Sequence, residues 1–176
     1  MSKKINKIKK ETYKDSLKNR KRKTKINVYI KTFKEWIPIL DALCKEVIIL
    51  RDDGKCRRCG QAMYISEKSG KLIGCDWSHI FRRNNYRVRW DLDNSKLLCS
   101  SFCGKHCHAW WHRNEVDGVL WWQEQIGKRK MELLKLRKEG DGSKIDCNAI
   151  HLYLLSEKKR LQTEKEKENH LVGDLS

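Results

Sequence analysis

The sequence predicts a small α+β protein in which a short cysteine-rich part is flanked by N- and C-terminal helices. Apolar residues recur at helical spacing on both sides of this part, and short strand-like runs lie inside it. The chain has 176 residues, of which 36% are charged, so it can build one modest core. We expect a basic flexible arm, a helical segment, a cysteine-rich domain and C-terminal helices over residues 1–26, 27–55, 56–116 and 117–176.

The charge of the chain is strongly positive and unevenly distributed. The net charge is +17, and residues 1–25 hold twelve Lys or Arg against two acidic residues, which makes +10 in this arm alone. Such a field attracts polyanions, of which nucleic acid is the first candidate. No apolar run approaches the length of a membrane-spanning helix, and no secretory signal follows the basic N-terminus. We therefore expect a cytoplasmic protein that does not span a membrane, with nucleic acid as the first candidate partner and a membrane surface as the second.

Three stretches of the chain have the apolar spacing of helices. Pro38 opens or precedes the first of them, because proline fits a first helical turn better than a helix interior. Cys44 falls on its apolar face, and we interpret it as a buried apolar residue, not a ligand. Gly127 predicts a break in the second stretch. The three predicted helices cover residues 41–51, 118–137 and 148–168, and a further one begins near Cys107.

A hairpin is predicted between the first helix and the middle of the chain. Short apolar runs over residues 62–65 and 72–77 flank a turn, so they should pair with each other. The second strand then leads directly to His79. A basic loop over residues 80–93 follows.

The cysteines form two closely spaced clusters. Cys56 and Cys59 make a two-residue knuckle, and Cys99, Cys103 and Cys107 follow some forty residues later. In the absence of a secretion signal, metal thiolates are favoured over disulfides. Two such clusters separated by a folded segment are typical of a structural zinc site with four ligands.

The histidines are arranged as phosphodiester hydrolysis requires. The reaction needs a base that deprotonates water near neutral pH, and a divalent cation that neutralises phosphate charge and stabilises the leaving oxygen. His79 ends a predicted strand, and Asn94 lies at the far end of the basic loop. His108 and His112 are spaced i, i+4 at a helix start, so they point the same way and can hold an ion.

Together these motifs resemble the HNH endonuclease superfamily, and within it the zinc-containing phage branch that includes the NinG recombination nucleases. The likeness covers residues 45–122. Leu50-Arg51-Asp52 before the first knuckle and Arg89-Trp90-Asp91 before Asn94 suggest this branch. The resemblance implies a zinc-stabilised ββα-metal (HNH) finger, in which a hairpin and a helix hold one ion and a separate zinc holds the cysteines.

The resemblance also implies roles for individual residues in a DNA endonuclease. His79 would be the general base, and Asn94 would fix the loop and so orient His79. His108 and His112 would bind the catalytic ion, Mg²⁺ or another divalent cation. The arginines beside the base are interpreted as DNA phosphate contacts. They are Arg82, Arg83, Arg87 and Arg89.

Two positions depart from the family pattern. Relatives place Asp or His directly before the base, where it binds the metal, but this chain has Ser78, so Asp76, water or a DNA phosphate would take that place. The later knuckle usually reads Cys-x-x-Cys-His, which favours Cys107 as a zinc ligand. Cys99 and Cys103 compete for the remaining place, with a slight preference for Cys99.

Two other functions compete with the endonuclease. A non-catalytic zinc-dependent nucleic-acid-binding protein would keep the scaffold without using His79 and Asn94. An RNA-binding or ribosome-associated zinc-knuckle protein would bind mainly through the basic arm. If the chain is a nuclease of the phage type, we expect it in a bacterial or phage-infected cell, with phage recombination or packaging proteins as further partners. The sequence leaves the oligomeric state open.

Overall fold

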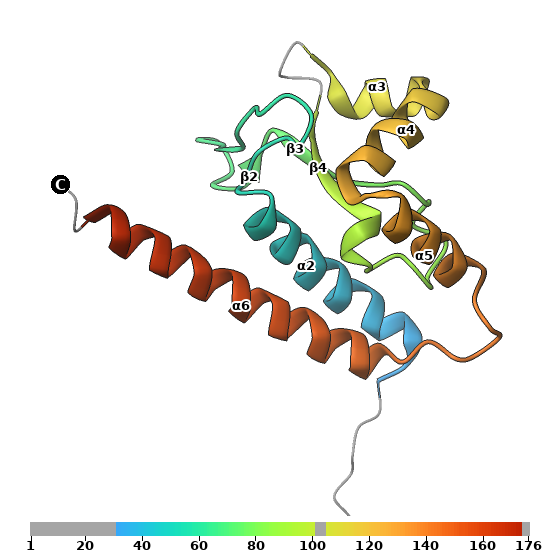
Figure 1. Cartoon of the computed structure of the whole chain (residues 1–176). Coiled ribbons are helices and arrows are strands. Elements are labelled where there is room, and N and C mark those ends of the chain that lie inside the picture. The colour runs from blue at the N-terminus through green and yellow to red at the C-terminus, as the bar shows by residue number, and fades with distance from the viewer. Residues whose placement is uncertain (1–30, 101–104, 174–176) are drawn as a thin grey trace, which may run out of the picture. The chain divides into compact units, whose positions relative to one another are not determined.

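The computed structural model describes residues 31–100 and 105–173, with side chains up to residue 168. The predicted arm over residues 1–26 and Cys103 lie outside the described residues. The class is α+β, as predicted, with two small antiparallel sheets among helices (Figure 1). In chain order the elements are α2 Phe33–Arg51, β1 Tyr64–Ile65, β2 Leu72–Ile73, β3 Cys75–His79, the 3₁₀ turn η1 Leu92–Asn94, β4 Ser95–Cys99, α3 Cys107–Arg113, α4 Glu115–Ile126, α5 Lys128–Glu139 and α6 Cys147–Gly173.

Helix α2 begins eight residues before the predicted start. The carboxylate of Glu35 accepts hydrogen bonds from the backbone N–H and the hydroxyl of Thr32, at 2.7 and 2.8 Å. These bonds stabilise the observed N-terminus of the helix. The prediction that Pro38 opens or precedes the helix is wrong, because Pro38 lies inside it. Pro38 is exposed, and five residues of helix precede it, so its missing N–H removes one bond near the first turn.

The predicted hairpin is correct only in its first part. β1 pairs with β2 around the turn, but β2 ends at Ile73. Gly74, with a φ of 104°, separates it from β3, which pairs with β4 in a second sheet. His79 therefore ends a strand outside the hairpin, and it faces Ser95 across the β3–β4 pair. The strands β3 and β4 enclose the loop 80–94, and α3 packs on β4.

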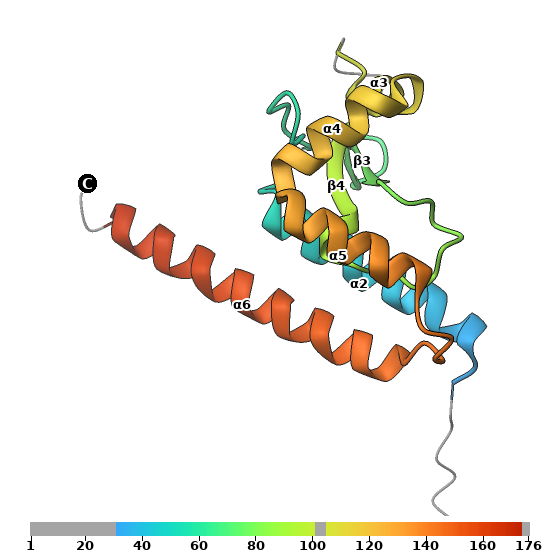
Figure 2. The ribbon, with the colours of Figure 1, turned by 45° about the vertical axis from the view of Figure 1, so that its right-hand side comes forward.

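The C-terminal helices surround this second sheet and α2. The predicted break occurs at Gly127, which has a φ of 87° and separates α4 from α5 (Figure 2). α6 runs parallel to α2. Three successive contacts join the two helices and the turn after α2: Trp36 with His151, Glu46 with Lys158, and Asp53 with Lys165. Leu154 of α6 is buried, whereas its neighbour Tyr153 is 49% exposed.

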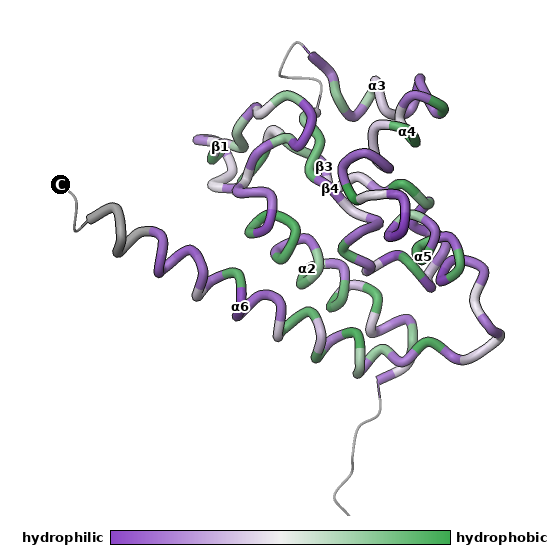
Figure 3. The backbone as a smooth tube through the Cα atoms, viewed as in Figure 1, coloured by the Kyte–Doolittle hydropathy of each residue, from purple (hydrophilic) through white to green (hydrophobic). Residues whose placement is uncertain are grey.

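The core lies where α2, β4 and the C-terminal helices meet. Figure 3 shows apolar segments in α2 and in the first turns of α6, and mainly hydrophilic residues in the later turns of α6. Cys44 is fully buried and its thiol contacts the carbonyl of Trp90, as expected for an apolar position. Among the described residues, no helix is long and apolar enough to cross a membrane. The largest fully buried side chains include Leu40, Ile48, Leu97, Leu98, Trp122, Met131, Leu134 and Leu154.

Candidate functional site

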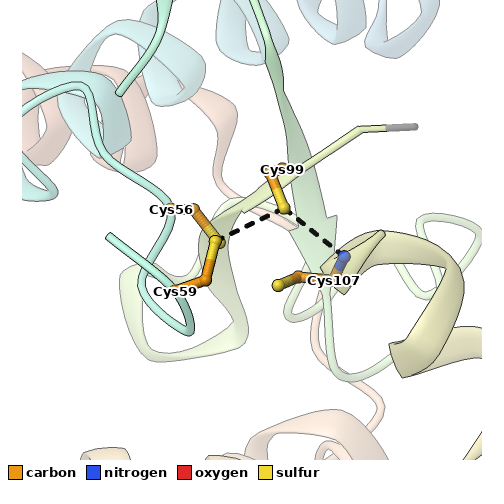
Figure 4. A group of neighbouring side chains, drawn as sticks. All are labelled: Cys56, Cys59, Cys99 and Cys107. Atoms are coloured by element: carbon orange, nitrogen blue, oxygen red, sulfur yellow. Dashed lines mark hydrogen bonds between the residues drawn. The ribbon is translucent and has the colours of Figure 1, made fainter. Parts of the chain in front are cut away.

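Four cysteines from distant parts of the sequence gather at one point. The sulfurs of Cys56, Cys59, Cys99 and Cys107 all lie within 4.8 Å of one another (Figure 4). This is the only group of three or more potential ligands that is found in the described part of the chain. Cys99, which the sequence slightly favoured over Cys103 as a ligand, belongs to this group. These four thiols could hold a metal ion.

The local backbone brings these cysteines together. The knuckle turns tightly, because the N–H of Gly60 donates to the carbonyl of Cys56 at 2.9 Å, and Arg57 N–H donates to Leu97 O at 2.9 Å. Cys99 is the last residue of β4 and Cys107 is the first residue of α3. Burial opposes ionisation of Cys56, but backbone hydrogen bonds outweigh it and lower the pKa of this thiol.

Asn94 ties both ends of the basic loop together. Its side chain is fully buried, and its Oδ1 accepts a hydrogen bond from Phe81 N–H at 2.8 Å. Its Nδ2 donates to the carbonyls of Val88 at 2.8 Å and of Phe81 at 3.2 Å. The Asn94 carbonyl also accepts from Ile80 N–H, directly after His79. These bonds hold the start and the middle of the loop to the residue that precedes β4.

The ring of His79 is held in one tautomer. Its Nε2 lies 3.2 Å from the carbonyl of Arg89, which can only accept, so Nε2 carries the hydrogen and Nδ1 keeps a free lone pair. Burial, and next the positive charge of Arg83, lower the pKa of His79 to about 4. The imidazole is therefore neutral at physiological pH and able to accept a proton.

His108 and His112 point at each other across one helical turn. Their Nε2 atoms lie 3.0 Å apart, and Nδ1 of His108 lies 2.9 Å from the carboxylate of Asp76. Asp76 thus orients the ring of His108 and leaves Nε2 toward His112. Burial lowers the pKa of His108 although Asp76 opposes this effect, so the neutral form that can bind metal is favoured.

His79 and His112 line the same cleft, which has a volume of about 480 Å³. The loop after β3 forms one wall, and residues of α3 to α5 form the other. Glu115 at the start of α4 and Lys138 at the end of α5 also line it, and the sequence motifs pointed to neither. Its remaining lining residues are Ile80, Phe81, Arg82, Asn84, Asn85, Trp111 and Val119.

The four arginines of the loop differ in their surroundings. Arg82 is exposed and lines the cleft. Arg83 lies over the ring of Trp77, with its guanidinium carbon 4.8 Å from the ring centre. Arg87 donates to the carbonyl of Ser143 at 3.0 Å. Arg89 forms a two-point ion pair with Asp41 of α2, at 2.8 and 2.6 Å, and keeps only 12% of its side chain exposed.

Arg51 and Arg89 form partly buried ion pairs with Asp52 and Asp41. Arg51 donates to the carbonyls of Leu92 and Ser95, and to the carboxylate of Asp52. Asp52 is 2% exposed and accepts from Leu97 N–H, so this pair joins the end of α2 to β4. Arg89 and Trp90 both donate to Asp41, which joins the basic loop to α2.

No protein-family model matches the chain, and neither the search of curated proteins nor the search of solved structures found a match.

Proposed function

We propose that this protein is a metal-dependent endonuclease of the HNH type that hydrolyses DNA phosphodiester bonds in the cleft beside β3. The observation that carries the proposal is that His79 and His112, which are 33 residues apart in the sequence, line one cleft. Asn94 holds the loop that follows His79 through hydrogen bonds to Phe81 and Val88. A binding protein that needed only the cysteine cluster would not require this arrangement.

In the proposed reaction His79 accepts the proton of the attacking water at Nδ1. The hydrogen bond from Nε2 to the Arg89 carbonyl fixes the ring plane and supports the tautomer that makes Nδ1 the base. Arg82 at the cleft wall is available to bind the phosphate and orient it for attack. A general base of this kind contributes about 10²- to 10⁴-fold to the rate.

His108 and His112 are the proposed ligands of the catalytic ion. Two nitrogens about 2.05 Å from one tetrahedral ion lie roughly 3.3 Å apart, close to the observed separation of 3.0 Å. Asp76 would then act as the outer carboxylate that aligns His108, which leaves water and DNA to complete the coordination. When bound, the ion supplies charge neutralisation at the phosphate and at the leaving 3′-oxygen. Two imidazoles favour a transition metal over Mg²⁺.

The cysteine cluster is the proposed structural zinc site. Sulfurs at about 2.3 Å from a tetrahedral zinc lie roughly 3.8 Å apart, and the sulfurs of Cys59 and Cys99 are separated by 3.6 Å. Arg58 donates toward the sulfur of Cys107 at 3.8 Å and lies 3.6 Å above the ring of Trp110. Its positive charge offsets part of the negative charge that four thiolates around one zinc would carry.

Plasmid cleavage tests the proposal. The zinc-loaded protein is incubated with supercoiled DNA and Mg²⁺, Mn²⁺ or Ni²⁺, and His79→Ala is compared with wild type. His151→Ala is the matched control, because His151 lies on α6 against Trp36 and does not line the cleft. We expect cleavage by wild type and the control, and a rate at least 10²-fold lower for His79→Ala.

The proposal is overturned if wild type binds DNA but leaves it intact with every ion, or if His79→Ala cuts as fast as wild type. Salt-sensitive binding without cleavage, unchanged by substitutions of His79 and Asn94, would identify a non-catalytic zinc-dependent nucleic-acid-binding protein instead.

A further inference from the structure

The cleft beside His79 adjoins a second hollow on the same loop. This hollow has a volume of about 470 Å³ and is lined by Tyr86, Arg87 and Ile145 as well as by residues that it shares with the cleft. The shared residues are Asn84, Asn85 and Lys138. Lys138 therefore stands where the two hollows meet, some distance along the chain from every motif of the nuclease pattern.

Lys138 lies in the last turn of α5, and its side chain is exposed. Met131 and Leu134 are fully buried, and Lys138 follows them at i+7 and i+4 on the same side of the helix, where the burial ends. The loop faces this end of α5, because Asn85 donates to the carbonyl of Lys138 and the ammonium of Lys138 lies 4.8 Å from the ring centre of Phe81. An exposed ammonium thus lies on the side of α5 that faces the loop.

The charge of Lys138 is not neutralised by the protein around it. Within residues 31–100 and 105–168, no carboxylate forms an ion pair with its ammonium. Among the residues that the structure describes, Glu115 is the single acid that lines the cleft, and no acid lines the second hollow. Arg82 adds a positive charge to the cleft. Arg87 adds one to the second hollow, and its guanidinium lies 3.9 Å from the exposed carboxylate of Asp141. A polyanion that follows the loop would meet Arg82, Lys138 and Arg87 in turn.

We propose that Lys138 is a substrate-positioning residue that binds a backbone phosphate of the DNA strand beside the phosphate that is cut. This inference rests on the proposed nuclease function and extends the substrate site onto α5, beyond residues 45–122. The second hollow then holds the strand after it leaves the cleft. Lys138 lowers the free energy of the bound strand without touching the reacting atoms, so its removal affects binding and not the chemical step.

The test compares Lys138→Ala, Lys138→Arg and the control Lys135→Ala in the full chain. Lys135 is exposed on the same helix and lines neither hollow. Binding to a duplex oligonucleotide is measured from 50 to 200 mM salt in a His79→Ala background, where DNA stays intact. We expect Lys138→Ala to weaken binding about fivefold and to reduce the salt slope by about 1, as loss of one phosphate contact does. Lys138→Arg should restore both values.

Cleavage by chains with His79 intact provides the second measurement. Lys138→Ala should raise KM about fivefold and leave kcat within twofold of wild type, because a positioning phosphate contact acts on bound and reacting DNA alike. The inference is overturned if Lys138→Ala and Lys135→Ala have the same salt slope and KM, or if Lys138→Arg fails to restore binding. Absence of cleavage by the wild-type chain would refute the nuclease alone, since the salt slope would still report the phosphate contact.

Discussion

Replacement of Asn94 by alanine tests how the structure holds its candidate base. The side chain is fully buried and makes three hydrogen bonds, two of them at 2.8 Å, to Phe81 and Val88 of the loop 80–93. Asn94→Ala removes all three and leaves the N–H and the carbonyl of Phe81 without partners, whereas the Val88 carbonyl still accepts from Asp91 N–H at 3.1 Å. Each unsatisfied group costs about 1–3 kcal/mol. We therefore expect the free energy of unfolding to fall by about 4 kcal/mol.

Asn84→Ala is the matched control for this substitution. Asn84 lies in the same loop, is exposed, and forms no side-chain hydrogen bond with the described residues. Its replacement should change the free energy of unfolding by less than about 0.5 kcal/mol, as is usual at a surface position.

Urea unfolding of the zinc-loaded protein at pH 7.5 measures both effects, and hydrogen exchange reports the loop directly. In Asn94→Ala the amides of Ile80 and Phe81 should lose protection. DNA cleavage should fall together with this protection, because the loop carries the Arg89 carbonyl that orients His79. A loss of stability below 1 kcal/mol, or full protection of these amides, would refute the hydrogen-bond reasoning.

Three further predictions concern the metal, the packing and the pH dependence. Chelation of zinc, or Cys99→Ser, should remove the bound zinc and unfold the cysteine-rich part, since such sites contribute on the order of 10 kcal/mol of folding free energy. Cys147 is a buried cysteine outside the cluster, so Cys147→Ser should retain one zinc per chain by mass spectrometry. Gly118→Ala, which in a helix interior usually stabilises by about 1 kcal/mol, should instead destabilise by about 1–3 kcal/mol in thermal or urea unfolding, because the new Cβ would lie 2.4 Å from two ring atoms of Trp111. His79 has a pKa of about 4 in the folded protein, below its ordinary value of 6.5, so its contribution to stability is complete above pH 6.5 and is lost as the pH falls toward 4. Between pH 7.5 and 5 wild type should lose about 2 kcal/mol more than His79→Asn, and equal losses would contradict the low pKa.

The sequence predicted best those features that depend on local spacing. The helix face that buries Cys44 and the start of α3 at Cys107 follow from periodicity, and the break at Gly127 follows from a single residue. The cysteine knuckle also has a local cause, because the N–H of Gly60 donates to the carbonyl of Cys56 and so keeps Cys56 and Cys59 in one turn. In each case the decisive interaction joins residues a few positions apart.

The prediction of a single second strand in the hairpin was wrong because the observed pairing joins residues that are far apart in the sequence. A short turn favours a local hairpin, and that rule assigned residues 72–77 to a single strand. Gly74 divides this run, and the following residues pair with β4 across a loop of fifteen residues. Burial decides the outcome: β4 is fully buried, so the longer strand beside it excludes more apolar surface from water than β1 would.

The arginines of the loop show that ion pairs between distant residues are also hard to predict from the sequence. A run of arginines beside a candidate base predicts phosphate contacts, yet the fold pairs Arg89 with Asp41, 48 residues away. Charge patterning cannot reveal an acid on another helix. Lys138 is a second case, because its ammonium lies over the ring of Phe81, which is 57 residues away in the sequence, and no local pattern pairs the two.

The cysteine cluster and the candidate cleft depend on each other through α3. This helix has seven residues, which is too few for an isolated helix to be stable in water. Its first residue, Cys107, belongs to the cluster, and His108 and His112 follow on the same two turns. Trp111 anchors the helix to the core between them. Loss of zinc should therefore separate the two histidines even when the proposed catalytic ion is in excess. Zinc removal and His112→Ala should both abolish DNA cleavage. Only zinc removal should also lower the hydrogen-exchange protection of the amides in β4.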